Sequence, residues 1–162
     1  MEPESLRTDD CIDNVVRFYS DMVYRLAFSQ MRNKSDADDI FQEVFLRYIN
    51  KHPHFESEEH RKAWLIRVTI NCTKKIWASS WRKKTAPLDD TIIFELSEEN
   101  DLNYELQKLP RKYRAVIHLF YYEDLSIAEI SEVLKQKPST VRTQLTRARR
   151  KLKEILKEDY DV

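Results

Sequence analysis

The sequence lacks glycine altogether, and its 162 residues include only five prolines and two cysteines. Glycine is the usual residue at the positive φ angles of tight β-hairpins, so its absence disfavours a hairpin-rich fold. No stretch approaches the roughly 20 consecutive apolar residues of a membrane span. The first five residues also lack the basic and apolar regions of a secretory signal. We therefore expect a protein that stays in the cytoplasm.

The two cysteines, Cys11 and Cys72, form no CxxC pair and have no histidine or cysteine at zinc-binding spacing. We therefore expect thiols in a reducing compartment rather than a disulfide or a metal site. Two clusters support an enzyme as a rival interpretation, one acidic and one of histidines: Asp36, Asp38, Asp39 and Glu43, then His52, His54 and His60. Neighbouring acids diverge by about 100° on a helix, and the histidines lack a matched carboxylate or cysteine set. The sequence thus predicts no catalytic residue, no metal site and no cofactor.

The chain is rich in helix-forming residues and separates its charges along its length. Its 41% hydrophobic content supports a folded core, and its long Leu-, Lys-, Arg-, Glu- and Ala-rich runs predict an all-α fold. The net charge is zero, but residues 51–86 carry nine basic and three acidic groups, and residues 107–157 carry thirteen and five. Between them, residues 87–106 carry no basic group and seven acidic ones. This pattern indicates two nucleic-acid-facing modules and an acidic connector.

The N-terminal module, residues 10–84, is predicted to hold three helices. The first has apolar residues three and four apart, at Ile12, Val15, Val16, Phe18, Tyr19, Met22, Val23, Leu26 and Ala27. The second follows a capping signal formed by Ser35 and Asp38, and its expected buried stripe is Ile40, Phe41, Val44, Phe45, Tyr48 and Ile49. The opposite face of that helix is predicted to be acidic, with Asp36, Asp39 and Glu43.

The third helix is expected from about Glu58 to Lys83. Its inner edge is predicted at Trp64, Leu65, Val68, Cys72 and Ile76, and its outer positions at Arg67, Asn71, Lys74, Lys75 and Arg82. From residue 85 to residue 104 the periodicity fades, Pro87 interrupts, and acidic residues accumulate. This segment is interpreted as a flexible linker and a domain boundary.

The C-terminal module, residues 105–158, shows a helix-turn-helix pattern from about Leu109 to Leu156. A first helix follows Pro110, and Ser126 with Glu129 three residues later forms a capping box for the second. A short break at residues 135–137 precedes Pro138, which stands at the first position of a long third helix. Helix, short turn and helix together make the unit that places a recognition helix in the major groove of DNA.

The last helix is divided into an apolar stripe and a basic face. The stripe consists of Val141, Leu145, Ala148, Leu152, Ile155 and Leu156. We assign Arg142 and Arg147 to bases or adjacent phosphates, supported by Thr140 and Thr143. The full expected reading face is Ser139, Thr140, Arg142, Thr143, Thr146, Arg147 and Arg150. A basic helix face is often merely solvated, but the capping box, the tight turn and the acid-free run from 139 to 153 favour DNA reading.

Three motif blocks occur in a characteristic order. They are the run 36–48 (DADDIFQEVFLRY), the segment 61–71 around Ala63, Trp64 and Leu65, and the region from Leu109 through Ser139–Arg142 to Arg147–Arg149. With them, the chain from about Asp13 to Leu156 resembles the extracytoplasmic-function sigma factors of bacteria, group 4 of the RNA polymerase sigma factors. The resemblance implies a polymerase-binding helix, a promoter-melting segment and a promoter-reading C-terminal domain.

The resemblance also implies roles for individual residues. Contacts to core RNA polymerase are expected at Asp38, Asp39, Gln42, Glu43 and Arg47. The loop 51–56 is expected to capture a base flipped from the minus-ten element, and the residues implied there are Phe55, Arg67, Asn71, Lys74, Lys75 and Arg82. The helix-turn-helix would bind the minus-thirty-five element as duplex promoter DNA, and the acidic linker would occupy the path of the nascent RNA. No inhibitory extension precedes Asp13 in this sequence, so the resemblance implies control by a separate anti-sigma factor.

Two positions in the sequence allow more than one interpretation. Lys135 stands where most family members have a small residue, often glycine, so it is expected to strain or remodel the turn. Trp77 and Trp81 lie four apart near the end of the third helix, where they either pack in the core or stack on bases. The principal rival is a stand-alone helix-turn-helix regulator, which would bind duplex DNA tightly by itself, as a dimer on two half-sites.

Overall fold

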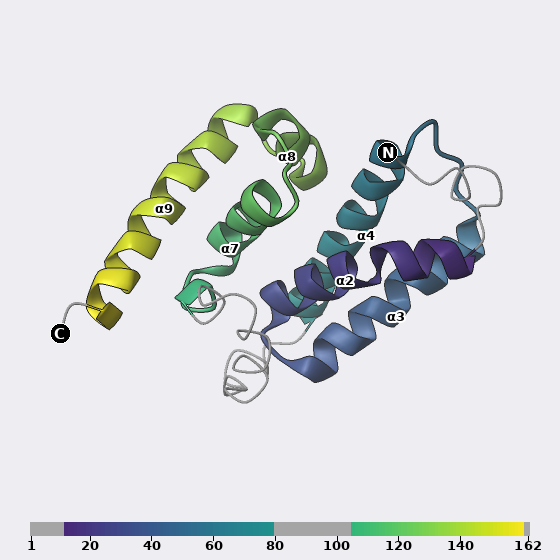
Figure 1. Ribbon diagram of the computed structural model, residues 1–162, viewed down its shortest axis with the longest axis horizontal. Coiled ribbons are helices and arrows are strands. Elements are labelled where there is room, and N and C mark those ends of the chain that lie inside the picture. Colours follow the sequence, from purple (N-terminus) through teal and green to yellow (C-terminus); the bar gives the residue numbers. More distant parts are fainter. Residues whose placement is uncertain (1–11, 80–104, 161–162) are drawn as a thin grey trace. The chain divides into compact units, whose positions relative to one another are not determined.

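The computed structural model describes residues 12–79 and 105–160, and every regular element in these ranges is helical (Figure 1). The elements are α2 (Ile12–Met31), α3 (Lys34–Lys51), α4 (Glu58–Ser79), α7 (Arg111–Ile117), the π-helix η2 (His118–Tyr122), α8 (Ile127–Leu134) and α9 (Pro138–Tyr160). The all-α prediction is confirmed. The predicted linker, residues 85–104, and the end of the third predicted helix lie outside the described residues.

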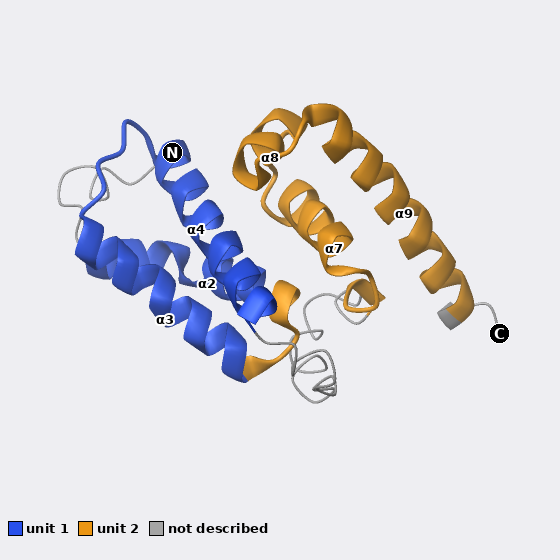
Figure 2. Cartoon of the chain, turned by 180° about the vertical axis from the view of Figure 1, so that it is seen from behind, with its two compact units in different colours: residues 1–28, 35–86 blue, residues 29–34, 87–162 orange. Residues whose placement is uncertain are grey.

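The chain divides into two compact units (Figure 2). Unit 1 comprises residues 1–28 and 35–86, and unit 2 comprises residues 29–34 and 87–162. None of the helices in the described ranges is long and apolar enough to cross a membrane.

Unit 1 is built on the apolar faces of α2, α3 and α4. Its fully buried side chains include Val15, Val23, Leu26, Ile40, Val44, Leu65 and Ile66. Within this core, Tyr19 donates from its hydroxyl to Glu58 Oε2 at 2.7 Å, and Arg61 donates to Glu58 Oε1 at 2.5 Å. All three side chains are buried. The Tyr19–Glu58 bond joins α2 to the start of α4, and the Arg61–Glu58 bond within α4 is charge-assisted.

Several sequence predictions for unit 1 are corrected. Phe18 and Ile49 were expected inside, but their exposed fractions are 55% and 43%. Asp36 was expected on the acidic outer face and is buried. The second helix begins at Lys34, so Ser35 lies inside it rather than ahead of it. The predictions differ from the structure because burial follows the positions of the neighbouring elements and not a single ideal stripe along each helix.

The inner face of α4 also differs from the predicted edge. Leu65 and Cys72 are buried as expected, but Trp64, Val68 and Ile76 are only partly buried. The remaining buried positions on this helix are Glu58, Arg61, Ile66, Thr69, Ile70 and Thr73. Two threonines can be buried here because their hydroxyls donate to the helix's own carbonyls, Thr69 to Leu65 at 2.7 Å and Thr73 to Ile70 at 2.6 Å. Trp77 is partly buried, and Trp81 lies outside the described residues.

Unit 2 contains the predicted helix-turn-helix. The capping box is formed as expected: Glu129 N–H donates to Ser126 Oγ at 3.1 Å, and Ser126 N–H donates to Glu129 Oε1 at 2.9 Å. Leu119, Ile130 and Leu145 are fully buried and come from η2, α8 and α9. Helix α9, the long last helix of this unit, starts at Pro138 as predicted and continues to Tyr160, beyond the expected end near Leu156.

The turn between α8 and α9 bends at Lys135, which adopts the left-handed conformation with φ 55° and ψ 47°. Gln136 N–H donates to the Ser131 carbonyl at 3.0 Å, and Lys135 N–H donates to the Glu132 carbonyl at 3.4 Å. These two bonds form a Schellman motif, whose left-handed position normally holds glycine. The strain expected at this turn is therefore found at Lys135, where a residue with a Cβ occupies a conformation that favours glycine.

Candidate nucleic-acid interface

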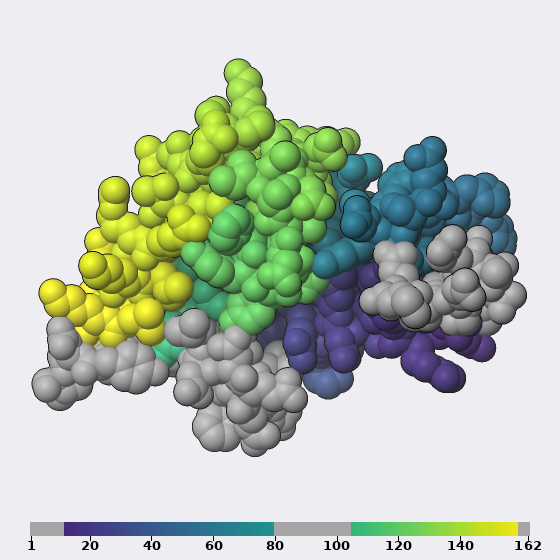
Figure 3. All heavy atoms as spheres, turned by 45° about the horizontal axis from the view of Figure 1, so that its top comes forward, coloured from purple at the N-terminus to yellow at the C-terminus, as the bar shows by residue number. Residues whose placement is uncertain are grey.

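Helix α9 presents one face to the core of unit 2 and the other to solvent. Val141, Leu145 and Ala148 are buried, and they recur at four and three residues, the spacing of one helix face. The side chains of α9, drawn in yellow-green to yellow, reach the surface of the unit in the space-filling view (Figure 3). All seven residues of the predicted reading face are exposed: Ser139, Thr140, Arg142, Thr143, Thr146, Arg147 and Arg150.

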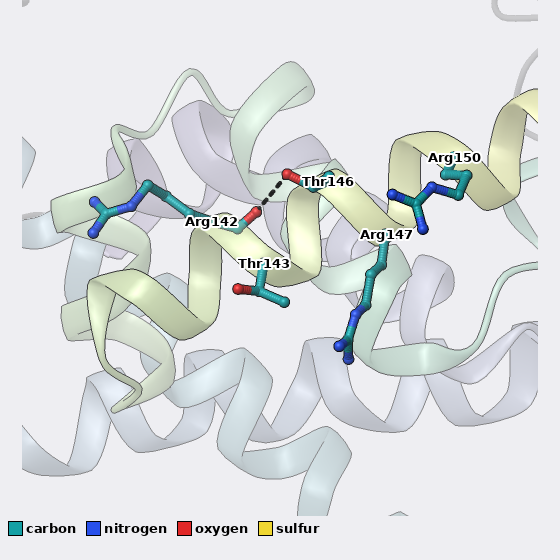
Figure 4. Close-up of a pocket in the computed structure, with 5 residues that line it drawn as sticks. All are labelled: Arg142, Thr143, Thr146, Arg147 and Arg150. Atoms are coloured by element: carbon teal, nitrogen blue, oxygen red, sulfur yellow. Dashed lines mark hydrogen bonds between the residues drawn. The ribbon is translucent and has the colours of Figure 1, made fainter.

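Five of these residues line one hollow on the surface of α9, namely Arg142, Thr143, Thr146, Arg147 and Arg150 (Figure 4). In the close-up, the side chains of Arg142 and Arg147 extend in different directions, with Thr143 between them. Ser139 and Thr140 lie in the first turn of the same helix and do not line the hollow. The structure therefore brings together the middle of the predicted reading face and leaves its N-terminal edge beside it.

The hollow is positively charged. Three of its five lining residues are arginines, and a guanidinium keeps its charge at any physiological pH. The first acidic residue of α9 is Glu154, one turn beyond Arg150. Such a surface attracts phosphate, and each guanidinium can also hold a guanine edge by two hydrogen bonds. Its charge is that expected of a helix that enters the major groove.

The two threonines of the hollow form hydrogen bonds within the helix. Thr143 Oγ1 donates to the Ser139 carbonyl oxygen at 3.0 Å, and Thr146 Oγ1 donates to the Arg142 carbonyl oxygen at 3.0 Å. The second of these bonds is drawn in Figure 4. Bonding to the carbonyl four residues earlier is a common alternative for threonine in a helix. The bond uses the one hydrogen of each hydroxyl, and the oxygen keeps its capacity to accept.

Sequence reasoning included Arg149 in the C-terminal motif block but assigned it no contact. Its Nε donates to the Tyr121 hydroxyl oxygen at 2.7 Å, and its guanidinium lies 5.4 Å from the ring centroid of Phe120. It also lies 5.5 Å from the ring centroid of Tyr121, which is 51% exposed. The contact joins residues 28 positions apart, so no local spacing could have indicated it.

The predicted polymerase-binding residues lie on α3 in unit 1. Asp39, Gln42 and Glu43 are exposed, and Asp38 is partly buried. Arg47 donates from Nε to Glu43 Oε1 at 2.8 Å, and this hydrogen bond raises the pKa of Arg47 above its ordinary value.

Two apolar side chains add to this surface. Leu46 and Ile49 on α3 are 52% and 43% exposed. Exposed leucine and isoleucine next to charged groups are typical of protein–protein interfaces, in which an apolar centre is bordered by a polar rim. Sequence reasoning missed both: it assigned no role to Leu46 and placed Ile49 in the core.

The predicted minus-ten residues are spread over α4 and the loop before it. Asn71, Lys74 and Lys75 are exposed, whereas Arg67 is partly buried. Phe55 packs in an aromatic cluster, with ring centroids 6.2 Å from Tyr48 and 6.0 Å from Trp64. Phe55 therefore helps to hold the conformation of the loop 51–56 through its ring contacts, in addition to lying at the edge of that loop. Arg82 lies outside the described residues.

The acidic and histidine clusters do not assemble into a metal centre. Among residues 12–79 and 105–160, no group of three or more His, Cys, Asp or Glu side chains is placed to hold a metal ion. Asp36 is buried while Asp39 is exposed, so the acidic residues of α3 do not converge on one point.

Comparison with known proteins identifies two regions in the chain. The family models that match are Sigma-70 region 2, over residues 15–83, and Sigma-70, region 4, over residues 99–152. The ECF RNA polymerase sigma factor SigW of Bacillus subtilis (strain 168) is 30% identical over 171 residues, covering 92% of this chain and 90% of SigW. The RNA polymerase sigma factor SigV of the same strain is 34% identical over 148 residues, covering 84% of this chain and 86% of SigV.

Two solved structures share the fold. CnrH, in complex with the cytosolic domain of CnrY, has a TM-score of 0.70 at 24% identity and covers 91% of this chain and 88% of CnrH. The sigma factor RpoE from Bartonella quintana, in complex with the anti-sigma factor NepR, has a TM-score of 0.68 at 19% identity, with coverages of 90% and 96%. The matched regions and the relatives that align over most of the chain show that it belongs to the ECF RNA polymerase sigma factors, which direct transcription initiation.

Proposed function

We propose that the two modules divide the work of promoter-specific initiation. Residues 10–84 bind core RNA polymerase and open the minus-ten element, and residues 105–158 read the minus-thirty-five element as duplex. The observation that carries this proposal is the exposed basic face of α9, where three arginines and two threonines line one hollow to which no acidic residue contributes. A duplex major groove admits one α-helix, and its edges and phosphates suit these side chains.

The polymerase surface of the proposal is the outer face of α3. Asp39, Gln42 and Glu43 are exposed there beside the apolar Leu46 and Ile49. Acidic groups repel phosphate, so this face suits a basic protein partner and disfavours DNA. Apolar burial of the two exposed side chains would add affinity, and the surrounding charges would select the partner.

Strand opening is proposed for α4 and the loop before it. Asn71 carries both a donor and an acceptor for a base edge, and Lys74 and Lys75 attract the phosphates of a single strand. Extruding a base costs a few kcal/mol, which binding must offset. This work needs no covalent chemistry, so we propose that the protein has no catalytic activity of its own and acts in the cytoplasm.

Control by a separate protein is also part of the proposal. The solved RpoE relative was determined with the anti-sigma factor NepR. A partner of this kind would act by covering surfaces that core polymerase or promoter DNA needs. Such a partner would compete with core polymerase for the acidic face of α3 and with promoter DNA for the basic face of α9.

Run-off transcription with bacterial core enzyme tests the proposed function. Templates carry a randomised minus-thirty-five region, and selected sequences are read after initiation. We expect initiation only when core and this chain are both present, and weak DNA binding by the chain alone. Absence of initiation together with absence of core binding would reject the proposal. Tight dimeric binding to duplex DNA without core would instead favour a stand-alone regulator.

Variants separate the two surfaces. Arg142→Ala and Arg147→Ala should reduce promoter selection and leave core affinity unchanged. Lys151→Ala removes one exposed positive charge of α9 outside the hollow and serves as the matched control. Reversing Asp39 and Glu43 to lysine should weaken core binding, because both charges lie on the exposed acidic face of α3. Reversal of Asp39 alone leaves the ion pair between Glu43 and Arg47 intact and separates the two effects. Glu132→Lys is the control for charge reversal elsewhere.

A further inference from the structure

The two threonines of the hollow have already used their hydroxyl hydrogens. A threonine hydroxyl has one hydrogen to donate, and Thr143 and Thr146 direct theirs to carbonyls of their own helix, each at 3.0 Å. Both side chains are exposed and line the hollow between the arginines (Figure 4). Each threonine therefore offers a ligand its γ-methyl, together with a hydroxyl oxygen that can accept a hydrogen bond but has none to donate.

This orientation limits the base edges that the threonines can recognise. Guanine presents only acceptors in the major groove, and a threonine without a free hydrogen has nothing to donate to them. The apolar group in the major groove is the C5-methyl of thymine, and a threonine methyl is among the side-chain groups that pack on it. The γ-methyls of Thr143 and Thr146 thus suit thymine, and their hydroxyl oxygens could contact only the N–H donors of adenine or cytosine.

We propose that Thr143 and Thr146 read thymines of the minus-thirty-five element by methyl-to-methyl contact. The inference rests on the proposed function, because it requires α9 to enter the major groove. Residues three apart on a helix have Cβ atoms about 5–6 Å apart, and base pairs are spaced about 3.4 Å along the duplex. The two contacted thymines therefore lie one or two base pairs apart, on either strand. Arg142 and Arg147 hold guanine or phosphate on each side.

The decisive probe is 2′-deoxyuridine, which differs from thymidine only by lacking the 5-methyl group. Holoenzyme is assembled from core polymerase and the full chain, and the promoter is the one selected from the randomised library. Each thymine of its minus-thirty-five element is replaced singly by deoxyuridine. With the unaltered protein, we expect open-complex affinity to fall about fourfold at the contacted positions, the size of one lost methyl burial. Replacement at other positions should have no effect.

Paired protein variants identify the group that does the reading. Thr→Val keeps a methyl in the same shape and removes the hydroxyl, whereas Thr→Ser keeps the hydroxyl and removes the methyl. At both positions we expect valine to retain promoter affinity and serine to lose about fourfold. Deoxyuridine at the contacted position should cost the serine variant nothing further, because the two changes remove the same contact.

The outcomes distinguish this inference from the proposed function. If the library yields no selected promoter, the proposed function itself fails. If selection is intact but deoxyuridine equals thymidine throughout, or the selected element has no thymine, the methyl contact is rejected. Loss of affinity in the valine variants with retention in the serine variants would mean that the hydroxyls do the reading. The deoxyuridine series uses unaltered protein, so a misfolded variant cannot produce its result.

Discussion

Arg149 donates from Nε to the hydroxyl oxygen of Tyr121 at 2.7 Å, which joins the recognition helix to the π-helical turn of the same unit. The guanidinium also lies over the rings of Phe120 and Tyr121. A π-helical turn closes with a hydrogen bond to the fifth residue rather than the fourth, and such turns occur often at functional sites. Here the turn carries both aromatic residues that contact Arg149. The contact holds α9 from the side, next to the residues that line the hollow.

Removing the Tyr121 hydroxyl should weaken this join. We expect Tyr121→Phe to lower the free energy of unfolding by about 1 kcal/mol, the usual contribution of one hydrogen bond. Arg149→Ala should cost more, because the contacts with both rings are lost as well. Urea denaturation of the full chain measures both changes. An unaltered stability in Tyr121→Phe, beside a loss in Arg149→Ala, would assign the effect to the rings alone.

The left-handed turn at Lys135 gives a second expectation. Lys135→Gly should raise the free energy of unfolding by about 1 kcal/mol, because glycine removes the Cβ clash of this conformation. Part of that gain is offset by the greater freedom of glycine in the unfolded chain. Lys135→Ala is the control, since alanine keeps the Cβ and should leave the stability nearly unchanged. Equal stabilisation by both variants would show that the lysine side chain, not the backbone, carries the cost.

Cys72 provides a pH-dependent expectation. Burial, the largest cause, raises the pKa of its thiol above the ordinary value; nearby Arg47 lowers it and Glu43 raises it. Because the folded pKa is raised, the protonated Cys72 makes its full contribution to the free energy of unfolding below the unfolded pKa of about 8.5. That contribution is lost as the pH rises through the folded pKa. The thiolate also forms at higher pH in the folded chain than in the unfolded one.

Alkylation by iodoacetamide in a Cys11→Ala background measures this shift. We expect Cys72 to react slowly in the folded protein, with a rate profile displaced to higher pH than in urea. The stability of the same protein should decline above about pH 8.5 more steeply than that of a Cys72→Ala variant. Equal alkylation rates in the folded and unfolded chains would contradict both expectations.

Local signals predicted unit 2 well. Ser126 and Glu129 form their capping box, and Pro138 opens α9, because both depend on residues within one turn of each other. The apolar stripe of α9 is buried at Val141, Leu145 and Ala148 for the same reason. The reading face followed directly, since it is the side of the helix that this stripe leaves exposed.

The burial of individual side chains was predicted less reliably in unit 1, because it depends on the neighbouring helices. Ile49 and Phe18 fit a helical stripe but are exposed, and Asp36 is buried although it stands among acidic residues. A periodic pattern shows which side of a helix is apolar, but it does not show how much of that side a neighbouring element covers. The residues at the ends and margins of a stripe are therefore decided by packing.

The sequence by itself determined the helical class, the two charged modules, the capping box and the basic face of α9. Each depends on residue type and on spacing within a few residues, where the covalent chain fixes the geometry. Only the tertiary structure decided that Arg149 binds Tyr121, that Leu46 and Ile49 are exposed beside the acidic face, and how the side chains of the hollow are disposed. These depend on contacts between separate helices or on the rotamer of a side chain, and neither is encoded in local spacing.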